Sequence, residues 1–334
     1  MEAIASAIDF SPSSPAYLMA LNLIVIGLVL SAFALGISRV LGSRKLWSWG
    51  VEELAQSLIN AALVGAIVGF GTLAATTMGS LADSSDFSNC AHFEKAQNSP
   101  IAYSLCSIED LQQKSWDILD GANEQAFSLG VLSSIELSFS VVRASPFSSL
   151  SNSAQNYSQW AQNISFILSA LEINRQFLFF IAQSAFSLFL PIGLLLRMFF
   201  ATRKLGGALM AGAIGFFMVY PLLYSAFVSG NSSISEPYKQ AFSDLDLLSQ
   251  TVSFAPAIDW GKEPNMSLVF SSLQGKQLME KVSIPYKSVS EFIGAASAYA
   301  ILYTIICFLL TLVCVKELSS LLGSEFRLDL FEKV

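Results

Sequence analysis

Five long runs of apolar residues alternate with polar segments along the chain. Each run holds about 20 residues, the number that a helix needs to cross roughly 30 Å of hydrocarbon. The runs cover about residues 17–37, 54–78, 176–198, 205–228 and 292–315. The pattern predicts an all-α fold, a polytopic α-helical membrane protein with about five transmembrane helices.

The composition supports a lipid-facing surface. Of the 334 residues, 53% are hydrophobic and only 13% are charged, with a mean hydropathy of +0.57. An average soluble domain is about a quarter charged. Because charge keeps a protein surface in water, this shortage points to the plasma membrane. A secretory signal peptide requires basic residues before its apolar segment, and none precedes the first run. We therefore expect the first helix to be retained.

The polar segments between the runs suggest five regions. Residues 1–78 hold the first two spans, 79–175 a large outer helical loop region, 176–228 a transmembrane hairpin, 229–288 a second outer loop, and 289–334 the last span with a cytoplasmic tail. Two stretches of the large loop, Ala126–Val142 and Tyr157–Glu172, are apolar enough to leave a crossing open. If both crossed, the total would be seven with the ends on the same sides.

A helix is predicted in the large outer loop. Ser107, followed three residues later by Asp110, has the form of a helix start, with a hydroxyl that can cap free amides. Apolar residues then recur at helical spacing, which indicates a helix lying against an apolar surface. These residues are Leu111, Ile118, Leu119, Ala122, Ala126 and Leu129.

The charge distribution predicts the orientation. Under the five-span arrangement, the inner segments hold nine of the 18 basic residues in only about 40 positions, whereas 19 of the 25 acids lie in outer segments. The positive-inside rule then places the N-terminus outside and the C-terminus inside. Six basic residues are expected to anchor the first two inner turns at the cytoplasmic surface: Arg39, Arg44, Lys45, Arg197, Arg203 and Lys204.

Cysteines and sequons mark the outer segments. Cys90 and Cys106 lie 16 positions apart in an outer, oxidising environment, which predicts a disulfide between them. Four N-x-Ser sequons also fall in predicted outer segments, where glycosylation is possible if the host has the machinery. Their asparagines are Asn156, Asn163, Asn231 and Asn265.

Small residues mark two faces for helix packing. Gly65 and Gly69 form a GxxxG in the second span, and small side chains let another helix approach closely. Gly207, Ala211 and Gly215 repeat every four residues in the fourth span and predict a second close-packing face.

The sequence offers no pattern that is typical of an enzyme. No predicted span contains Asp or His, and neither an H-E-x-x-H zinc motif nor a Walker loop occurs. The single histidine, His92, is predicted to be a surface residue beside the disulfide. No catalytic residue, metal or cofactor is therefore expected. The chain also has no Lys/Arg-rich tail, so no soluble nucleic-acid-binding domain is predicted.

The layout of the chain resembles a known family. The hairpin segments Leu190–Gly193, Thr202–Gly207 and Tyr220–Leu222, with the five-span topology, are similar to the VirB/TrbL-type polytopic membrane subunit of type IV secretion and conjugation systems, which has archaeal Ced-like relatives. The resemblance implies a channel or scaffold subunit of a DNA-transfer apparatus, in homo-oligomers or with other membrane and pilus subunits. A separate ATPase would supply the energy. The alternative is a structural or receptor-like multipass protein with a folded outer domain and no transport activity.

Overall fold

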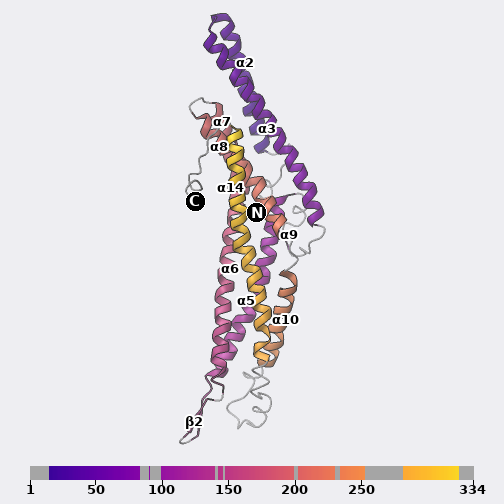
Figure 1. Cartoon of the computed structure of the whole chain (residues 1–334), viewed down its shortest axis with the longest axis vertical. Coiled ribbons are helices and arrows are strands. Elements are labelled where there is room, and N and C mark those ends of the chain that lie inside the picture. The colour runs from indigo at the N-terminus through magenta and orange to yellow at the C-terminus, as the bar shows by residue number, and fades with distance from the viewer. Residues whose placement is uncertain are drawn as a thin grey trace. The chain divides into compact units, whose positions relative to one another are not determined.

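The computed structural model of the chain describes residues 15–82, 90, 99–139, 142–145, 147–198, 202–229, 234–252 and 281–322. Helices make up nearly all of this part (Figure 1). Within it, five helices are long and apolar enough to cross a membrane, which confirms the multipass helical class. They are Leu18–Leu41, Arg44–Leu73, Leu150–Arg197, Arg203–Val228 and Lys281–Leu321.

The chain divides into two compact units. The first comprises Met1–Ser107, Asn174–Ser229 and Thr304–Val334, and the second comprises Ile108–Ile173 and Gly230–Tyr303.

The first two candidate spans form a hairpin in the first unit. Helix α2 runs from Pro15 to Leu41 and α3 from Arg44 to Ala82, and Gly42 makes the turn with a φ of 60°. Such a positive φ favours glycine because it has no Cβ to clash. The helices meet closely at Gly50, where an added Cβ would lie 3.0 Å from Cγ of Leu35.

The third candidate span is much longer than predicted. Helix α6 (Leu150–Ser184) continues through the π-helix η1 (Ala185–Phe189) into α7 (Leu190–Met198), and 48 residues from Leu150 to Arg197 are helical without a break. No glycine or proline interrupts α6, so nothing in the sequence ends the helix at the predicted boundary of residue 176.

The fourth span contains a second π-helix. Helix α8 (Arg203–Ile214) leads through η2 (Gly215–Val219) into α9 (Tyr220–Ser229). Both η1 and η2 end two residues before a proline, Pro191 and Pro221. Proline lacks an N–H and clashes with the carbonyl four residues earlier. A wide turn just before each proline accommodates this defect, so neither helix ends there.

The last span also contains a π-helix between two α-helices. Helix α13 (Pro285–Ser297), η4 (Ala298–Tyr303) and α14 (Thr304–Leu321) belong to one stretch of 41 residues that begins at Lys281.

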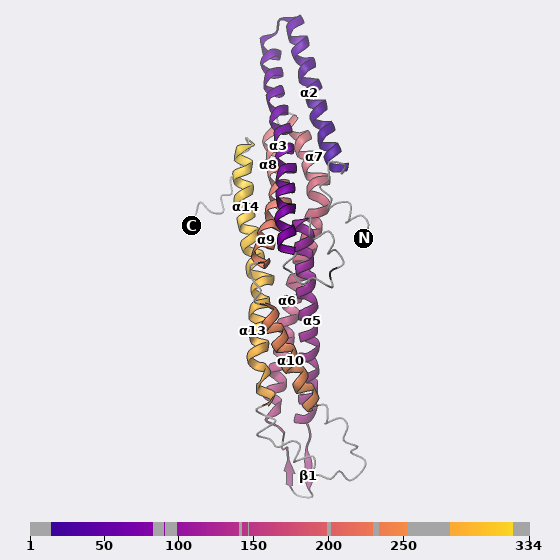
Figure 2. The same ribbon diagram turned by 90° about the vertical axis from the view of Figure 1, so that its right-hand side faces the viewer.

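The second unit is a bundle of helices. Helix α5 (Pro100–Ser133) and α10 (Ser235–Val252) run alongside α6 and α13 (Figures 1 and 2). Polar bonds tie the helices together: Tyr238 of α10 donates to Asp117 of α5 at 2.8 Å, and Tyr157 of α6 donates to the Val282 carbonyl at 3.0 Å. Burial, reinforced by the bond to Asp117, raises the pKa of Tyr238 to about 12.

The helix predicted from Ser107 onward is confirmed, but it begins earlier than expected. Helix α5 starts at Pro100, and the Ser107 hydroxyl donates to the Tyr103 carbonyl inside the helix instead of capping a start. Five of the six residues of its predicted apolar face are buried: at most 6% of each of Leu111, Ile118, Leu119, Ala122 and Leu129 is exposed. The sixth, Ala126, is half-buried.

Neither of the two stretches left open forms a spanning helix of its own. Helix α5 ends at Ser133, and β1 (Leu137–Phe139) then pairs antiparallel with β2 (Val142–Ala144), so residues 126–142 are not one helix. Residues 157–172 belong to α6, in the same helix as the third candidate span.

Candidate functional site

A cluster of charged residues lies among the membrane helices of the first unit. Arg203, at the start of α8, binds Glu52 of α3 through Nη1 at 2.6 Å and Glu53 through Nη2 at 3.2 Å. The Glu53 side chain is only 8% exposed, against 55% for that of Glu52. Charges inside membrane helices are costly and usually mark functional positions. We therefore treat this cluster as the candidate site.

Arg197 completes the cluster from the end of α7. The residue is 4% exposed, and it is attracted by Glu53 and repelled by Arg203. Its Nε and Nη1 atoms form no hydrogen bond with any described residue. Beside it, the hydroxyl of Thr202, the residue before α8, donates to the Leu196 carbonyl of α7 at 2.7 Å. The site thus contains a buried cation with unused donors.

Helix α3 presents a buried polar face beside the cluster. Glu53, Ser57 and Asn60 are spaced for one side of a helix, and each is at most 8% exposed. Oε1 of Gln56 and Oδ1 of Asn60 are also enclosed and accept no hydrogen bond from the described residues. This face is polar although it belongs to the candidate span Arg44–Leu73.

The register of the hairpin places Glu53 of α3 opposite the apolar helix α2. Gly50 contacts Leu35, and equal steps along antiparallel helices bring Glu53 level with Ala32, within the candidate span Leu18–Leu41.

A second polar tie joins three membrane helices. The Tyr220 hydroxyl donates to Oδ1 of Asn174 at 2.6 Å, and Nδ2 of Asn174 donates to Oγ1 of Thr304 at 3.2 Å. Asn174 and Tyr220 are almost fully buried. The ring of Phe177 packs edge-on against Tyr220, with the centroids 5.3 Å apart. This network holds α6, α9 and α14 in register.

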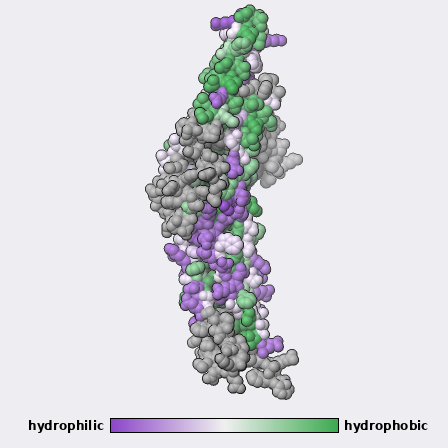
Figure 3. Space-filling model, turned by 180° about the vertical axis from the view of Figure 1, so that it is seen from behind, coloured by the Kyte–Doolittle hydropathy of each residue, from purple (hydrophilic) through white to green (hydrophobic). Residues whose placement is uncertain are grey.

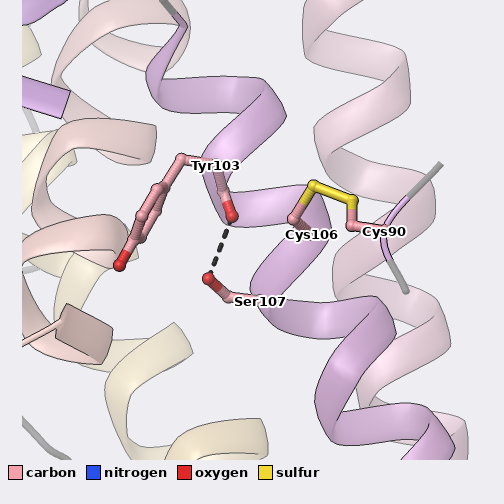
Figure 4. The surroundings of a disulfide bond; sticks show 4 residues. All are labelled: Cys90, Tyr103, Cys106 and Ser107. Carbon is pink, nitrogen blue, oxygen red and sulfur yellow. Dashed lines mark hydrogen bonds between the residues drawn. A yellow bond between two sulfur atoms is a disulfide. The ribbon is translucent and has the colours of Figure 1, made fainter. Parts of the chain in front are cut away.

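Cys90 and Cys106 form the predicted disulfide. Their Cα atoms lie 5.4 Å apart. Figure 4 shows the disulfide on one side of α5 and the Tyr103 ring projecting to another side. Ser104 extends the attachment within the first unit, since its hydroxyl donates to the Pro221 carbonyl at 3.2 Å. The start of α5 is therefore bonded both to the segment after α3 and to α9.

An open groove of about 530 Å³ lies between α5 and α6 in the second unit. Trp116, Leu168 and Ile173 give it apolar walls, and Gln112 donates to Glu172 at 3.1 Å along its edge. Apolar walls with a few polar groups are typical of ligand and peptide grooves.

The two predicted packing faces differ in the structure. Gly207, Ala211 and Gly215 are buried, and an added Cβ at Gly215 would lie 2.3 Å from Val315 of α14. Gly65 and Gly69 are exposed, and nothing lies within 4 Å of an added Cβ at either position. A close approach of two backbones was not predicted: a Cβ added at Gly206 would lie 2.6 Å from the Gly193 carbonyl oxygen.

Most of the predicted anchors lie at the surface. Arg39, Arg44, Lys45 and Lys204 are exposed, and the Arg39 guanidinium lies 5.7 Å from the ring centroid of Trp47. Arg197 and Arg203 instead belong to the charged cluster.

The sequons and the histidine fall in different parts of the chain. Asn156 and Asn163 are exposed on α6, whereas Asn231, Asn265 and His92 lie outside the described residues. The described residues bring no three His, Cys, Asp or Glu side chains together as metal ligands.

The spacing of polar residues in α3 is a sequence signal for this cluster. Glu53, Ser57 and Asn60 continue the spacing of a buried helix face toward Val64.

Comparisons with known proteins identify no relative: no protein-family model matches the chain, and neither curated proteins nor solved structures gave a match.

Proposed function

We propose that this chain is a membrane-embedded scaffold or channel subunit of a conjugation-like DNA-transfer or secretion apparatus. It lies in the plasma membrane with its N-terminus outside and its C-terminus in the cytoplasm, and it crosses the bilayer five times. It assembles as a homo-oligomer or with other membrane and pilus subunits. A separate ATPase supplies the energy.

The length of the spanning helices is the observation that carries the proposal. The 48-residue helix from Leu150 to Arg197 is about 72 Å long, more than twice the thickness of the hydrocarbon. A large part of it must therefore project beyond the bilayer. An apparatus that crosses a cell envelope needs subunits that contact other components outside the membrane, and the part of this helix beyond the bilayer offers a surface for such contacts.

A receptor-like protein without transport activity is the second candidate. The groove between α5 and α6 favours it, because Trp116 is 52% and Ile173 is 71% exposed in a setting suited to a ligand. Exposed apolar residues around a concave surface often mark binding sites.

The number of copies in the assembly separates the two candidates. The full chain would be extracted from its native membrane into polymer-bounded lipid discs and weighed by mass photometry. A scaffold subunit is expected at many times the 36.1 kDa of one chain, together with an ATPase and pilin. A monomer or dimer without these partners would contradict the proposal and favour the receptor.

A labelling experiment tests the orientation. Single cysteines at Ser43, in the α2–α3 turn, and at exposed Ser151, at the start of α6, would be treated with a membrane-impermeant maleimide on intact cells. We expect labelling at Ser151→Cys and none at Ser43→Cys until the cells are opened. The reverse pattern would invert the topology.

A further inference from the structure

Arg197 is a buried cation with two donor atoms that no described residue pairs. Its Nε and Nη1 atoms are enclosed and make no hydrogen bond with the described residues. Native proteins rarely leave buried polar groups unpaired, and an unpaired buried charge is more costly still. Arg197 therefore marks a position where an acceptor from outside the chain is expected.

The missing acceptor is an anion. Arg203 already engages the nearby carboxylates, Glu52 at 2.6 Å and Glu53 at 3.2 Å. Arg203 thus uses both carboxylates of the cluster, and Lys204, the next residue of α8, adds a further positive charge close by. An anion from outside the chain would accept the unused hydrogen bonds of Arg197.

The surroundings of Arg197 indicate where the anion comes from. Arg197 ends one candidate span and Arg203 begins the next, so both lie at the end of a membrane helix. Nearby apolar residues are exposed, with Ile192 at 41%, Leu195 at 46% and Leu205 at 58%. Acyl chains of lipids can cover such residues, and basic residues between membrane helices bind anionic headgroups.

We propose that Arg197, near the end of α7, together with the exposed Lys204, near the start of α8, binds the phosphate group of an anionic phospholipid. A guanidinium matches the geometry of a phosphate, and the long side chain can turn its head toward the ligand while its aliphatic stem stays packed. Free phosphate offers the same chemistry without the acyl chains. The site does not depend on the proposed role in DNA transfer.

Native mass spectrometry of the full-length protein tests the site. Short-chain phosphatidylglycerol, short-chain phosphatidylcholine and inorganic phosphate would each be titrated separately. We expect phosphatidylglycerol to bind about tenfold more tightly than phosphatidylcholine. Arg197→Gln should remove this preference, whereas Lys45→Gln, an exposed basic residue of α3, should keep it.

Several results would overturn the proposal. Equal affinity for the two lipids, or equal loss in both variants, would exclude a specific site at Arg197. Binding of inorganic phosphate as tight as that of phosphatidylglycerol would identify a soluble anion as the ligand.

Two further variants keep the test valid if Arg197→Gln does not fold. Lys204→Gln should lower the affinity for phosphatidylglycerol about threefold, and Glu52→Gln should raise it about threefold, because each changes the local charge by one. If the affinity for phosphatidylglycerol stayed unchanged in either variant, that result would contradict the site.

Discussion

The α2–α3 hairpin and the helix from α8 to α9 both qualify as membrane-spanning, yet their surroundings are opposite. In their most apolar stretches, 22% of α2 and 19% of α3 residues are buried, against 61% in Arg203–Val228. Figure 3 shows hydrophobic side chains over the exposed surface of the hairpin. Lipid accepts apolar side chains as readily as a protein core does, so exposure of this kind costs the hairpin little.

The two regions are also held together differently. Small and polar residues such as Ser31, Ser38 and Ser57 line the buried face of the hairpin, and the ion pairs of Arg203 link it to α8. Helix α8 instead meets α7 through Gly193 and Gly206, and η2 meets α14 at Gly215, with close contact at each. In a membrane, polar ties and close helix approach therefore determine the arrangement more than apolar burial does.

The largest expected effect is the loss of the link between the hairpin and α8. Arg203→Ala leaves Glu53 buried without its main cation, and removing one partner of a buried ion pair costs about 3 kcal/mol or more. The free energy of unfolding would be measured by SDS titration in mixed micelles. Arg39→Ala, at an exposed position, is the control. Equal stability of the two variants would show that the cluster does not hold the hairpin.

Removal of the disulfide should have a comparable but smaller effect. Cys90→Ser with Cys106→Ser frees the segment after α3 from α5, and a loop of this length predicts a loss of about 3 kcal/mol in the chain-entropy model. Reducing agent should destabilise the wild-type protein by the same amount and leave the double variant unchanged. Sensitivity of the double variant to reduction would point to another thiol.

Replacing a glycine with alanine should lower the stability in α8 but not in α2. Gly206→Ala places a Cβ 2.6 Å from a backbone oxygen, which cannot move away, and overpacking of this kind costs about 1–3 kcal/mol. Gly36→Ala in α2 meets nothing within 4 Å and should be neutral or slightly stabilising. Thermal unfolding of both variants in one detergent would measure the difference. Similar losses would mean that α2 has a partner where the structure shows open space.

The smallest effect is expected at the polar tie among α6, α9 and α14. Tyr220→Phe removes the hydrogen bond to Asn174, and interhelical bonds in membranes contribute about 0.6–2 kcal/mol. A double-mutant cycle with Asn174→Ala would isolate the coupling. Additive losses would show that the bond adds no stability.

Local features of the sequence were sufficient to predict several elements. Runs of apolar residues located the five candidate spans, and the spacing of Cys90 and Cys106 located the disulfide. Gly207, Ala211 and Gly215 predicted a buried face because small residues at helical spacing admit a neighbouring helix.

Features that depend on distant residues were not predictable in the same way. Glu53 and Arg203 are 150 positions apart, so neither stretch of sequence reveals the ion pair between them. Gly193 and Gly206 meet across the α7–α8 turn, a contact that neither helix reveals alone. The start of α6 was not predicted because the first half of the helix is polar, although its backbone continues unbroken into the apolar half.

The π-helices have a consequence for the rotational phase of the long helices. Successive residues of an α-helix are rotated by about 100° around the axis, so a turn with one extra residue shifts every later side chain by that angle. In the helix from Leu150 to Arg197, the side chains after Phe189 therefore point about 100° away from the direction that an uninterrupted α-helix would give them. Deleting Ser187 would restore α-helical phase and turn Arg197 away from Glu53 without changing either residue.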